Sequence, residues 1–373
     1  MSKSTALNVN ITASRVGAYY DHACPRFTAY NIIADPTLVG WSERSREHTA
    51  SQEAGKVWEK EALCILEESG FSCYAEDENE NVVSDFKSMS GRDAKFGDLS
   101  EETTIDIFRS PDKYLRDLAV KKTGYIYQTT ISATESFMNS LIFGNEELSG
   151  MCRDMFEDRD ECIHANWSIC KPDLIRVDIE EDGTPVFSVI DMKHAKHAHL
   201  SHKVQVAVYV RLLENLFKDR GISGRINREE GYLWNFKKAE PRAFDLSVVM
   251  PYMDRFFKEE LPVTLKGLKE VLPDTFTGLK DCLKDEVADS LNRHFCAIPT
   301  QMCEWCDNYQ VCIKWQKEHE PVTLLPYLSS FAQEYLRTRQ IPLNTAEFKS
   351  YVSDDDNRTR MSEDCFSLKK LLR

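Results

Sequence analysis

Residues 171–193, KPDLIRVDIEEDGTPVFSVIDMK, form the stretch that decides the fold. Leu174–Ile179 alternates apolar and polar side chains and is rich in branched residues, which predicts a β-strand. The acidic residues 180–184 include Asp-Gly, a frequent hairpin signal. Pro185–Lys193 then predicts a second strand. We therefore expect an antiparallel hairpin here, within an α/β fold.

The expected hairpin carries charged residues where its two strands begin and end. Asp173 starts the first strand, and Asp191 and Lys193 end the second. Asp191 and Lys193 are two residues apart, so they project from one face of the strand. Carboxylate oxygens suit Mg²⁺ or Mn²⁺, and an ammonium group nearby can stabilise a phosphoryl transition state. A D-x-K triplet also recurs by chance, so ordinary polar residues at strand ends are the alternative.

The next predicted helix, residues 201–218, adds a second polar pair. Gln205 and Tyr209 are four apart and share one helix face. The series PD, D-x-K and Q-x-x-x-Y resembles the nuclease motifs of the RecB-like branch of the PD-(D/E)XK superfamily. The resemblance implies a restriction-endonuclease-like core, which is a mixed central sheet flanked by helices, here with helical additions.

The resemblance also implies a role for each motif residue. Asp173 and Asp191 would be ligands of Mg²⁺ or Mn²⁺, and Lys193 would be the catalytic lysine. Gln205 and Tyr209 would be the accessory pair that positions the substrate or the lysine.

Members of this branch carry one more site residue on an upstream helix, in a G-x-x-H-E-like setting. We predict that helix over residues 53–69, where residues 55–59 read GKVWE. Trp58 replaces the histidine, whereas Glu59 retains the acid. We favour Glu59 as the third metal ligand, with Glu61 as the second choice. The competing interpretation is a solvated helix residue with no role.

Three of the twelve cysteines form the pattern C-x₂-C-x₅-C, at Cys303, Cys306 and Cys312. Zinc and iron–sulfur clusters both suit a set of four thiolates, so a fourth ligand is needed. Iron–sulfur members of the RecB-like branch have one distant N-terminal cysteine before this pattern, and Cys24 occupies that place. The resemblance thus implies a 4Fe-4S cluster on these four cysteines, with zinc as the alternative. Such a cluster would clamp the two ends of the nuclease domain together.

A basic stretch follows the hairpin, and it contains His194, His197, His199 and His202. These histidines offer a zinc site as a further hypothesis, with His194 and His197 on one helical face. The carboxylates of the neighbouring hairpin favour Mg²⁺ or Mn²⁺ and not zinc. We therefore favour the interpretation that these histidines line a phosphate-facing surface or lie in solvent.

The expected organisation is a nuclease domain at residues 1–320 and a helical tail at 321–373. Within the domain we place the core at about 50–240, a helical region at about 245–295 and the cysteine motif at 303–312. The tail should form two short helices around the break RQIPLN. Residues 10–31 should hold a short helix ending near Cys24-Pro25, because the residue before proline tends to leave the helical region.

Composition limits the functional classes. The net charge of −14 argues against a protein that coats nucleic acid indiscriminately. No apolar run reaches the length of a membrane span and no secretory signal is evident, so we expect a cytoplasmic protein.

Two functions remain in competition. The first is a metal-dependent deoxyribonuclease, an exonuclease on single-stranded or end-bearing DNA in repair, recombination or defence, working with a helicase or another protein of such a pathway. The second is a non-catalytic nucleic-acid-binding or assembly subunit that keeps the fold and the cluster.

Overall fold

The structure is a computed structural model of the 373-residue chain. It describes residues 7–33, 46–83, 86, 96–138, 163–167, 170–272 and 285–295. Closer to the C-terminus it describes residues 302, 303, 306, 309, 312, 315, 316, 318, 332, 335, 336, 339, 341, 345–365 and 368. The described residues fall into two compact units. One takes Leu7 and those of 22–43 and 264–373, and the other takes those of 8–21 and 44–263.

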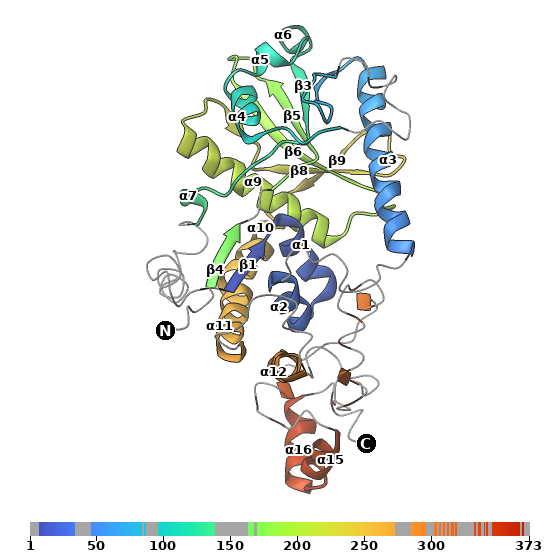
Figure 1. Cartoon of the computed structure of the whole chain (residues 1–373), viewed down its shortest axis with the longest axis vertical. Coiled ribbons are helices and arrows are strands. Elements are labelled where there is room, and N and C mark those ends of the chain that lie inside the picture. The colour runs from blue at the N-terminus through green and yellow to red at the C-terminus, as the bar shows by residue number, and fades with distance from the viewer. Residues whose placement is uncertain are drawn as a thin grey trace. The chain divides into compact units, whose positions relative to one another are not determined.

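The second unit is built on a mixed seven-stranded sheet (Figure 1). Its path runs through β2 (Ser72–Tyr74), β3 (Thr123–Tyr127), β5 (Leu174–Ile179), β6 (Pro185–Lys193), β8 (Glu230–Asn235) and β9 (Arg242–Asp245). The short β7 (Arg225–Ile226) pairs with β6 off this path. Strands β3, β5 and β6 are antiparallel neighbours, whereas β6 and β8 are parallel. The expectation of an α/β fold with a mixed sheet is confirmed.

The central hairpin has the predicted bounds, with β5 at Leu174–Ile179 and β6 at Pro185–Lys193. The amide of Glu180 donates to the carbonyl of Thr184, which closes a tight loop of three residues. Gly183 takes a φ of +85°, a conformation that glycine adopts without steric cost. This turn sets the register between the two strands and therefore fixes which residues meet at the hairpin's open end.

Two long helices flank the sheet. One face is covered by α3 (Arg46–Glu68), whose Trp58 and Leu63 pack with Tyr127, Ile190 and other residues in one apolar cluster. This helix is longer than the predicted 53–69, since it begins at Arg46 and ends one residue earlier.

The opposite face is covered by α9 (Leu200–Arg220), which contains the predicted helix 201–218. Phe217 of α9 packs edge-on against Phe187 of β6, with ring centroids 4.9 Å apart. Gly231 of β8 allows a close approach of this helix, because a Cβ there would lie 2.7 Å from Val206 Cγ1. The predicted strand 231–236 corresponds to β8, displaced by one residue.

Shorter elements complete the second unit. They are α1 (Ala13–His22), α4 (Glu101–Arg109), α5 (Pro111–Tyr114), α6 (Leu118–Lys121), α7 (Glu135–Met138), α10 (Met250–Arg255), the π-helix η2 (Phe256–Glu260) and the two-stranded sheet of β1 (Leu7–Ile11) with β4 (Ile163–Trp167). As predicted, α1 ends just before Cys24-Pro25. Ala23 has a φ of +45°, and Pro25 then begins a new helix, α2 (Pro25–Ile33), which the sequence had not indicated.

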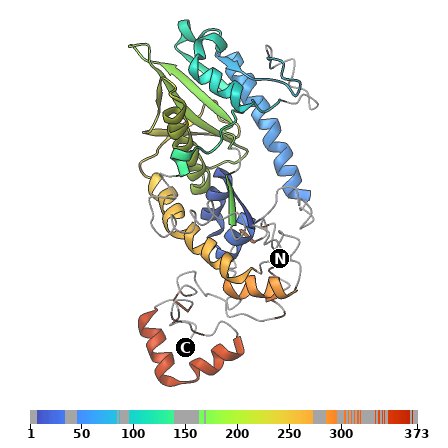
Figure 2. The ribbon, with the colours of Figure 1, turned by 60° about the vertical axis from the view of Figure 1, so that its left-hand side comes forward.

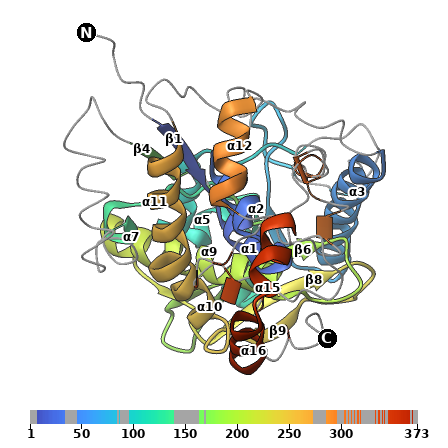
Figure 3. The same ribbon diagram turned by 90° about the horizontal axis from the view of Figure 1, so that it is seen from below.

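The first unit is helical in its described residues. It contains α2, most of α11 (Leu261–Val271) and α12 (Asp285–His294), and the last two lie within residues 245–295. Near the C-terminus α15 (Thr345–Val352) and α16 (Asp355–Asp364) lie next to each other, as Figures 2 and 3 show in red. Helix α15 matches the predicted tail helix after RQIPLN. Most residues of the expected helix before it lie outside the described part, so that helix and the boundary at 320 stay predictions.

A search of the described helices found none with the length and apolar character needed to cross a membrane.

Candidate active site

The open end of the central hairpin brings the predicted acidic residues together. Leu174 pairs with Ile190, so the next position along each strand places Asp173 opposite Asp191. Opposed residues of an antiparallel pair share one face of the sheet. Oδ2 of Asp173 accepts a hydrogen bond of 2.7 Å from the amide of Met192, which fixes this carboxylate against β6. The two carboxylates therefore meet on the sheet face that α9 covers.

Asp191 and Lys193 form an ion pair within this site. The Lys193 ammonium lies 3.0 Å from Oδ1 and 2.9 Å from Oδ2 of Asp191, which is fully buried. Burial and the charge of Asp173 raise the pKa of Asp191 to about 8, although Lys193 acts in the opposite direction. Burial alone would lower the pKa of Lys193, but the surrounding carboxylates outweigh it and raise that pKa. The lysine is therefore a cation held among acids.

Glu59 of α3 joins the same group of charges. Its Oε2 accepts hydrogen bonds of 2.8 Å from the Tyr127 hydroxyl and 3.3 Å from Gln128 Nε2. Burial, and then the charge of Asp173, raise the pKa of Glu59 to about 7. Glu61, the second choice, is exposed. Of the two glutamates, the structure brings Glu59 to the site.

Trp58, the residue before Glu59, has a structural role. The side chain is 1% exposed and lies in the core, and its Nε1 donates a 3.2 Å hydrogen bond to the carbonyl of Trp234. Its ring also meets the Trp234 ring edge to face at 6.0 Å. Trp58 thus fixes α3 against the sheet. Because Glu59 is the next residue of the same helix, this contact also fixes the direction of the Glu59 side chain.

Gln205 and Tyr209 are paired on α9, as their spacing indicated. Nε2 of Gln205 donates a 3.0 Å hydrogen bond to the hydroxyl oxygen of Tyr209. Burial, followed by the charges of Asp191 and Asp173, raises the pKa of Tyr209 well above 10. The phenol is therefore neutral and lies beside the two carboxylates.

Sequence reasoning missed two residues that shape this site, Tyr127 and Gln128. Both bind Glu59, and the backbone amide of Gln128 also donates a 2.9 Å hydrogen bond to the carbonyl of Asp173. Gln128 has a φ of +50°, which is unusual for a residue other than glycine. The available signal was weak: a glutamine directly after the strand segment GYIY.

The carboxylates of Glu59, Asp173 and Asp191 are of the chemical type that binds a divalent cation, although their oxygens do not surround a common point. Across the described ranges, no three His, Cys, Asp or Glu side chains converge closely enough to surround an ion. Oδ2 of Asp191 is buried and accepts no hydrogen bond of good geometry; only the ion pair with Lys193 reaches it. The pKa values of Glu59 and Asp191 are raised first by burial and then by the charge of Asp173, and buried carboxylates of this kind match a hard cation's preferences.

The four histidines after the hairpin do not share one helix: His194 and His197 lie in a bend, His199 precedes α9, and His202 lies in α9. Residues 194–197 form bends, so the proposed helical face shared by His194 and His197 is wrong. His194 packs on Phe236, with ring centroids 4.2 Å apart. Burial, and then the charge of Lys193, lower the pKa of His202 to about 3. A neutral, part-buried His202 is part of the packing of α9.

The predicted cluster cysteines all fall in the first unit. Cys303 and Cys306 are joined by a hydrogen bond of 3.1 Å from the amide of Cys306 to the carbonyl of Cys303. Burial raises the pKa of the Cys312 thiol, Arg26 lowers it, and the thiols of Cys24 and Cys303 raise it again. Arg26 and Cys24, almost 290 positions earlier in the sequence, thus influence the Cys312 thiol.

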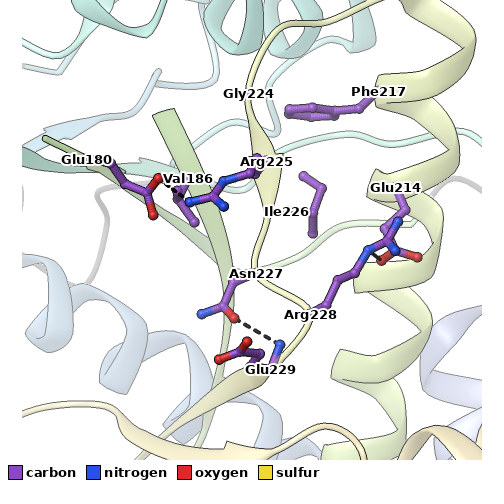
Figure 4. A pocket seen from close by; sticks show the side chains of 10 residues that line it. All are labelled: Glu180, Val186, Glu214, Phe217, Gly224, Arg225, Ile226, Asn227, Arg228 and Glu229. Atoms are coloured by element: carbon purple, nitrogen blue, oxygen red, sulfur yellow. Dashed lines mark hydrogen bonds and ion pairs between the residues drawn. The ribbon is translucent and has the colours of Figure 1, made fainter. Parts of the chain in front are cut away.

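A pocket of about 640 Å³ lies away from the acidic site, between β7 and the C-terminal half of α9 (Figure 4). It reaches Val186 of β6, five residues from Asp191, which is about 16 Å along a strand. Each of its two arginines forms an ion pair with a glutamate: Arg225 with Glu180, and Arg228 with Glu214. These charges compensate each other, and the pocket is not part of the candidate active site.

Comparison with known proteins gave no family model and no curated protein that matches the sequence.

Proposed function

We propose that this chain is a metal-dependent DNA nuclease of the RecB-like branch of the PD-(D/E)XK superfamily, which hydrolyses phosphodiester bonds in single-stranded DNA or at DNA ends. One observation carries the proposal: Asp173, Asp191 and Lys193 meet at the end of one hairpin. The mixed sheet with helices on both faces supports it, because the resemblance implies that architecture.

Glu59, Asp173 and Asp191 are the residues that would hold Mg²⁺ or Mn²⁺. When bound, the ion would supply positive charge to the substrate phosphate and make a water molecule more acidic. The three acids come from α3 and from both strands of the hairpin, so a rigid scaffold supports each of them. Burial, and after it the charge of Asp173, raises the pKa values of Glu59 and Asp191, and a bound cation would favour their charged forms.

Lys193 would act on the phosphate as a fixed cation. It stays protonated at neutral pH, since its pKa is raised. Asp191 holds the ammonium through two contacts, so the charge is in place before substrate arrives. The neutral Tyr209 hydroxyl, bound by Gln205, offers a hydrogen-bonding group on the α9 side of the same site.

Cys24, Cys303, Cys306 and Cys312 would hold a 4Fe-4S cluster within the first unit. The influence of Cys24 and Cys303 on the pKa of the Cys312 thiol supports a common site. Tying Cys24 to the C-terminal cysteines would close a chain loop that contains the whole sheet unit, which restricts the unfolded state.

Cleavage of end-labelled single-stranded DNA in Mg²⁺ or Mn²⁺ tests the nuclease. We expect cleavage by the wild type, its loss with EDTA, and a reduction on the order of 10²-fold or more in Lys193→Ala. Lys196→Ala is the matched control, because Lys196 is an exposed lysine three residues further on. If Lys193→Ala cleaves as fast as Lys196→Ala, the proposed catalytic lysine is wrong. If the metal-loaded wild type cleaves no DNA, the non-catalytic binding subunit is the better description.

A further inference from the structure

Arg26, two residues after Cys24, is a buried cation in the first unit. Its side chain is 1% exposed. Nε donates a 2.9 Å hydrogen bond to the carbonyl of Phe295, and Nη2 donates one of 2.6 Å to the carbonyl of Asn292. The guanidinium carbon lies 4.8 Å from the centroid of the Trp315 ring. Helix α2, the end of α12 and the segment after the cysteine motif thus hold this group in one orientation.

No carboxylate compensates this charge within the part of the chain that the structure describes. The described ion pairs do not include Arg26, and its Nη1 is buried without a hydrogen-bond acceptor. Carbonyl oxygens and an aromatic face offset only part of the cost of burying a cation. A buried charge left unpaired is strongly destabilising, so this guanidinium requires an anion as its partner.

The candidates for that anion are the cysteine sulfurs, because Arg26 follows Cys24 by two residues and the ring that it lies over, Trp315, follows Cys312 by three. The Arg26 guanidinium lowers the pKa of the Cys312 thiol, against the larger effect of burial. Cys24 and Cys303 act on the same thiol. Four thiolates carry more negative charge than an oxidised iron–sulfur core or a zinc ion carries positive charge, so a group held by them is an anion overall.

We infer that Arg26 is the buried counter-cation of the group held by Cys24, Cys303, Cys306 and Cys312, with Nη1 as the hydrogen-bond donor to sulfur. The inference rests on the cluster half of the proposed function. A fixed positive charge and an N–H···S bond favour the more negative, reduced cluster. Arg26 is therefore a positioning residue that raises the reduction potential of the cluster and slows its loss.

The test compares the purified full chain with Arg26→Gln, Arg26→Lys and the control Arg339→Gln. Arg339 also lies over an aromatic ring in the same unit, 5.8 Å from the Tyr335 centroid, but its side chain is 62% exposed. We expect a more negative reduction potential and faster iron loss to a chelator in Arg26→Gln. Arg26→Lys should lie between Arg26→Gln and the wild type, and Arg339→Gln should match the wild type. A folded Arg26→Gln that matches Arg339→Gln in both measurements overturns the inference.

A second measurement needs no variant, in case Arg26→Gln does not fold. Wild type labelled with ¹⁵N in the arginine guanidinium should show weak ¹⁵N coupling to the reduced cluster in pulsed EPR, and its absence overturns the inference. Wild type that holds zinc refutes the iron–sulfur cluster, and the rate of zinc loss from Arg26→Gln then decides the role of Arg26. Wild type that binds neither metal overturns the cluster and the inference together.

Discussion

The ammonium of Lys193 lies within 3.0 Å of both carboxylate oxygens of Asp191, a residue with no exposed surface. The two residues are two apart on β6 and therefore share a face. This pair couples the chemistry of the candidate site to the stability of the fold, since removal of either partner leaves the other charge buried.

The first prediction concerns that coupling. Lys193→Met should lower the free energy of unfolding at pH 9 by about 3 kcal/mol, because the folded protein must then either keep Asp191 as an uncompensated buried anion or bind a proton there that the unfolded chain does not bind. The double variant Asp191→Asn/Lys193→Met should recover most of the loss, as no buried charge then remains. Urea unfolding of the four members of this cycle measures the effect. Additive losses would show that the pair contributes no coupling.

Metal binding gives the second prediction. At a Mn²⁺ concentration of 100 times the dissociation constant, the wild type should gain about 2.7 kcal/mol of stability. Glu59→Gln should lose at least about 1.4 kcal/mol of that gain, which corresponds to a tenfold weaker affinity. Glu61→Gln is the matched control on the same helix and should keep the full gain. Equal gains in both variants, measured by thermal unfolding with and without Mn²⁺, would exclude Glu59 as a ligand.

Tyr127 supports Glu59, and the third prediction removes only its hydroxyl. Tyr127→Phe should lower kcat/KM for DNA cleavage about 5-fold, equivalent to a net hydrogen-bond contribution of about 1 kcal/mol. The reason is that Glu59 then keeps only the longer bond from Gln128. Tyr125→Phe, on the same strand, should cleave like the wild type. A normal rate in Tyr127→Phe would limit this hydroxyl to a structural role.

The fourth prediction follows from the pKa of His202, which is lowered to about 3 from an ordinary value of 6.5. The unfolded chain binds a proton at this residue below pH 6.5, whereas the folded protein does not until about pH 3. Stability should therefore fall as the pH falls, by about 2 kcal/mol between pH 7 and pH 5 from this residue. In His202→Leu that part of the slope should vanish, while His197→Leu, at an exposed position, should keep it. Urea midpoints at the two pH values provide the comparison.

The cysteine motif gives the fifth prediction. Cys306→Ala should lose the brown colour of an iron–sulfur protein and become less stable or inactive, because one of four cluster ligands is gone. Cys64→Ala should keep the colour, since Cys64 packs beside the α3 core cluster instead. Visible absorption with iron and sulfide analysis makes the measurement. A colourless Cys306→Ala with full stability and activity would argue against a structural cluster.

The sequence by itself determined the local elements of the sheet unit. The bounds of β5 and β6 follow from two runs rich in branched and apolar residues and from a turn between them, with glycine at the position that needs a positive φ. The pairing of the two strands places Asp173, Asp191 and Lys193 at one end of the hairpin. Short-range sterics and hydrophobic periodicity decide these features, so they can be read from consecutive residues.

Only the tertiary structure decided which residues from distant parts of the sequence lie beside Asp173, Asp191 and Lys193. Glu59 rather than Glu61 reaches the site because Trp58 is fixed in the core by Trp234, far along the chain. The positions of Gln128 and of the buried Arg26 likewise depend on packing partners that no local pattern reveals. Burial and long-range contacts set the charge and direction of such side chains, and both arise only once the chain has folded.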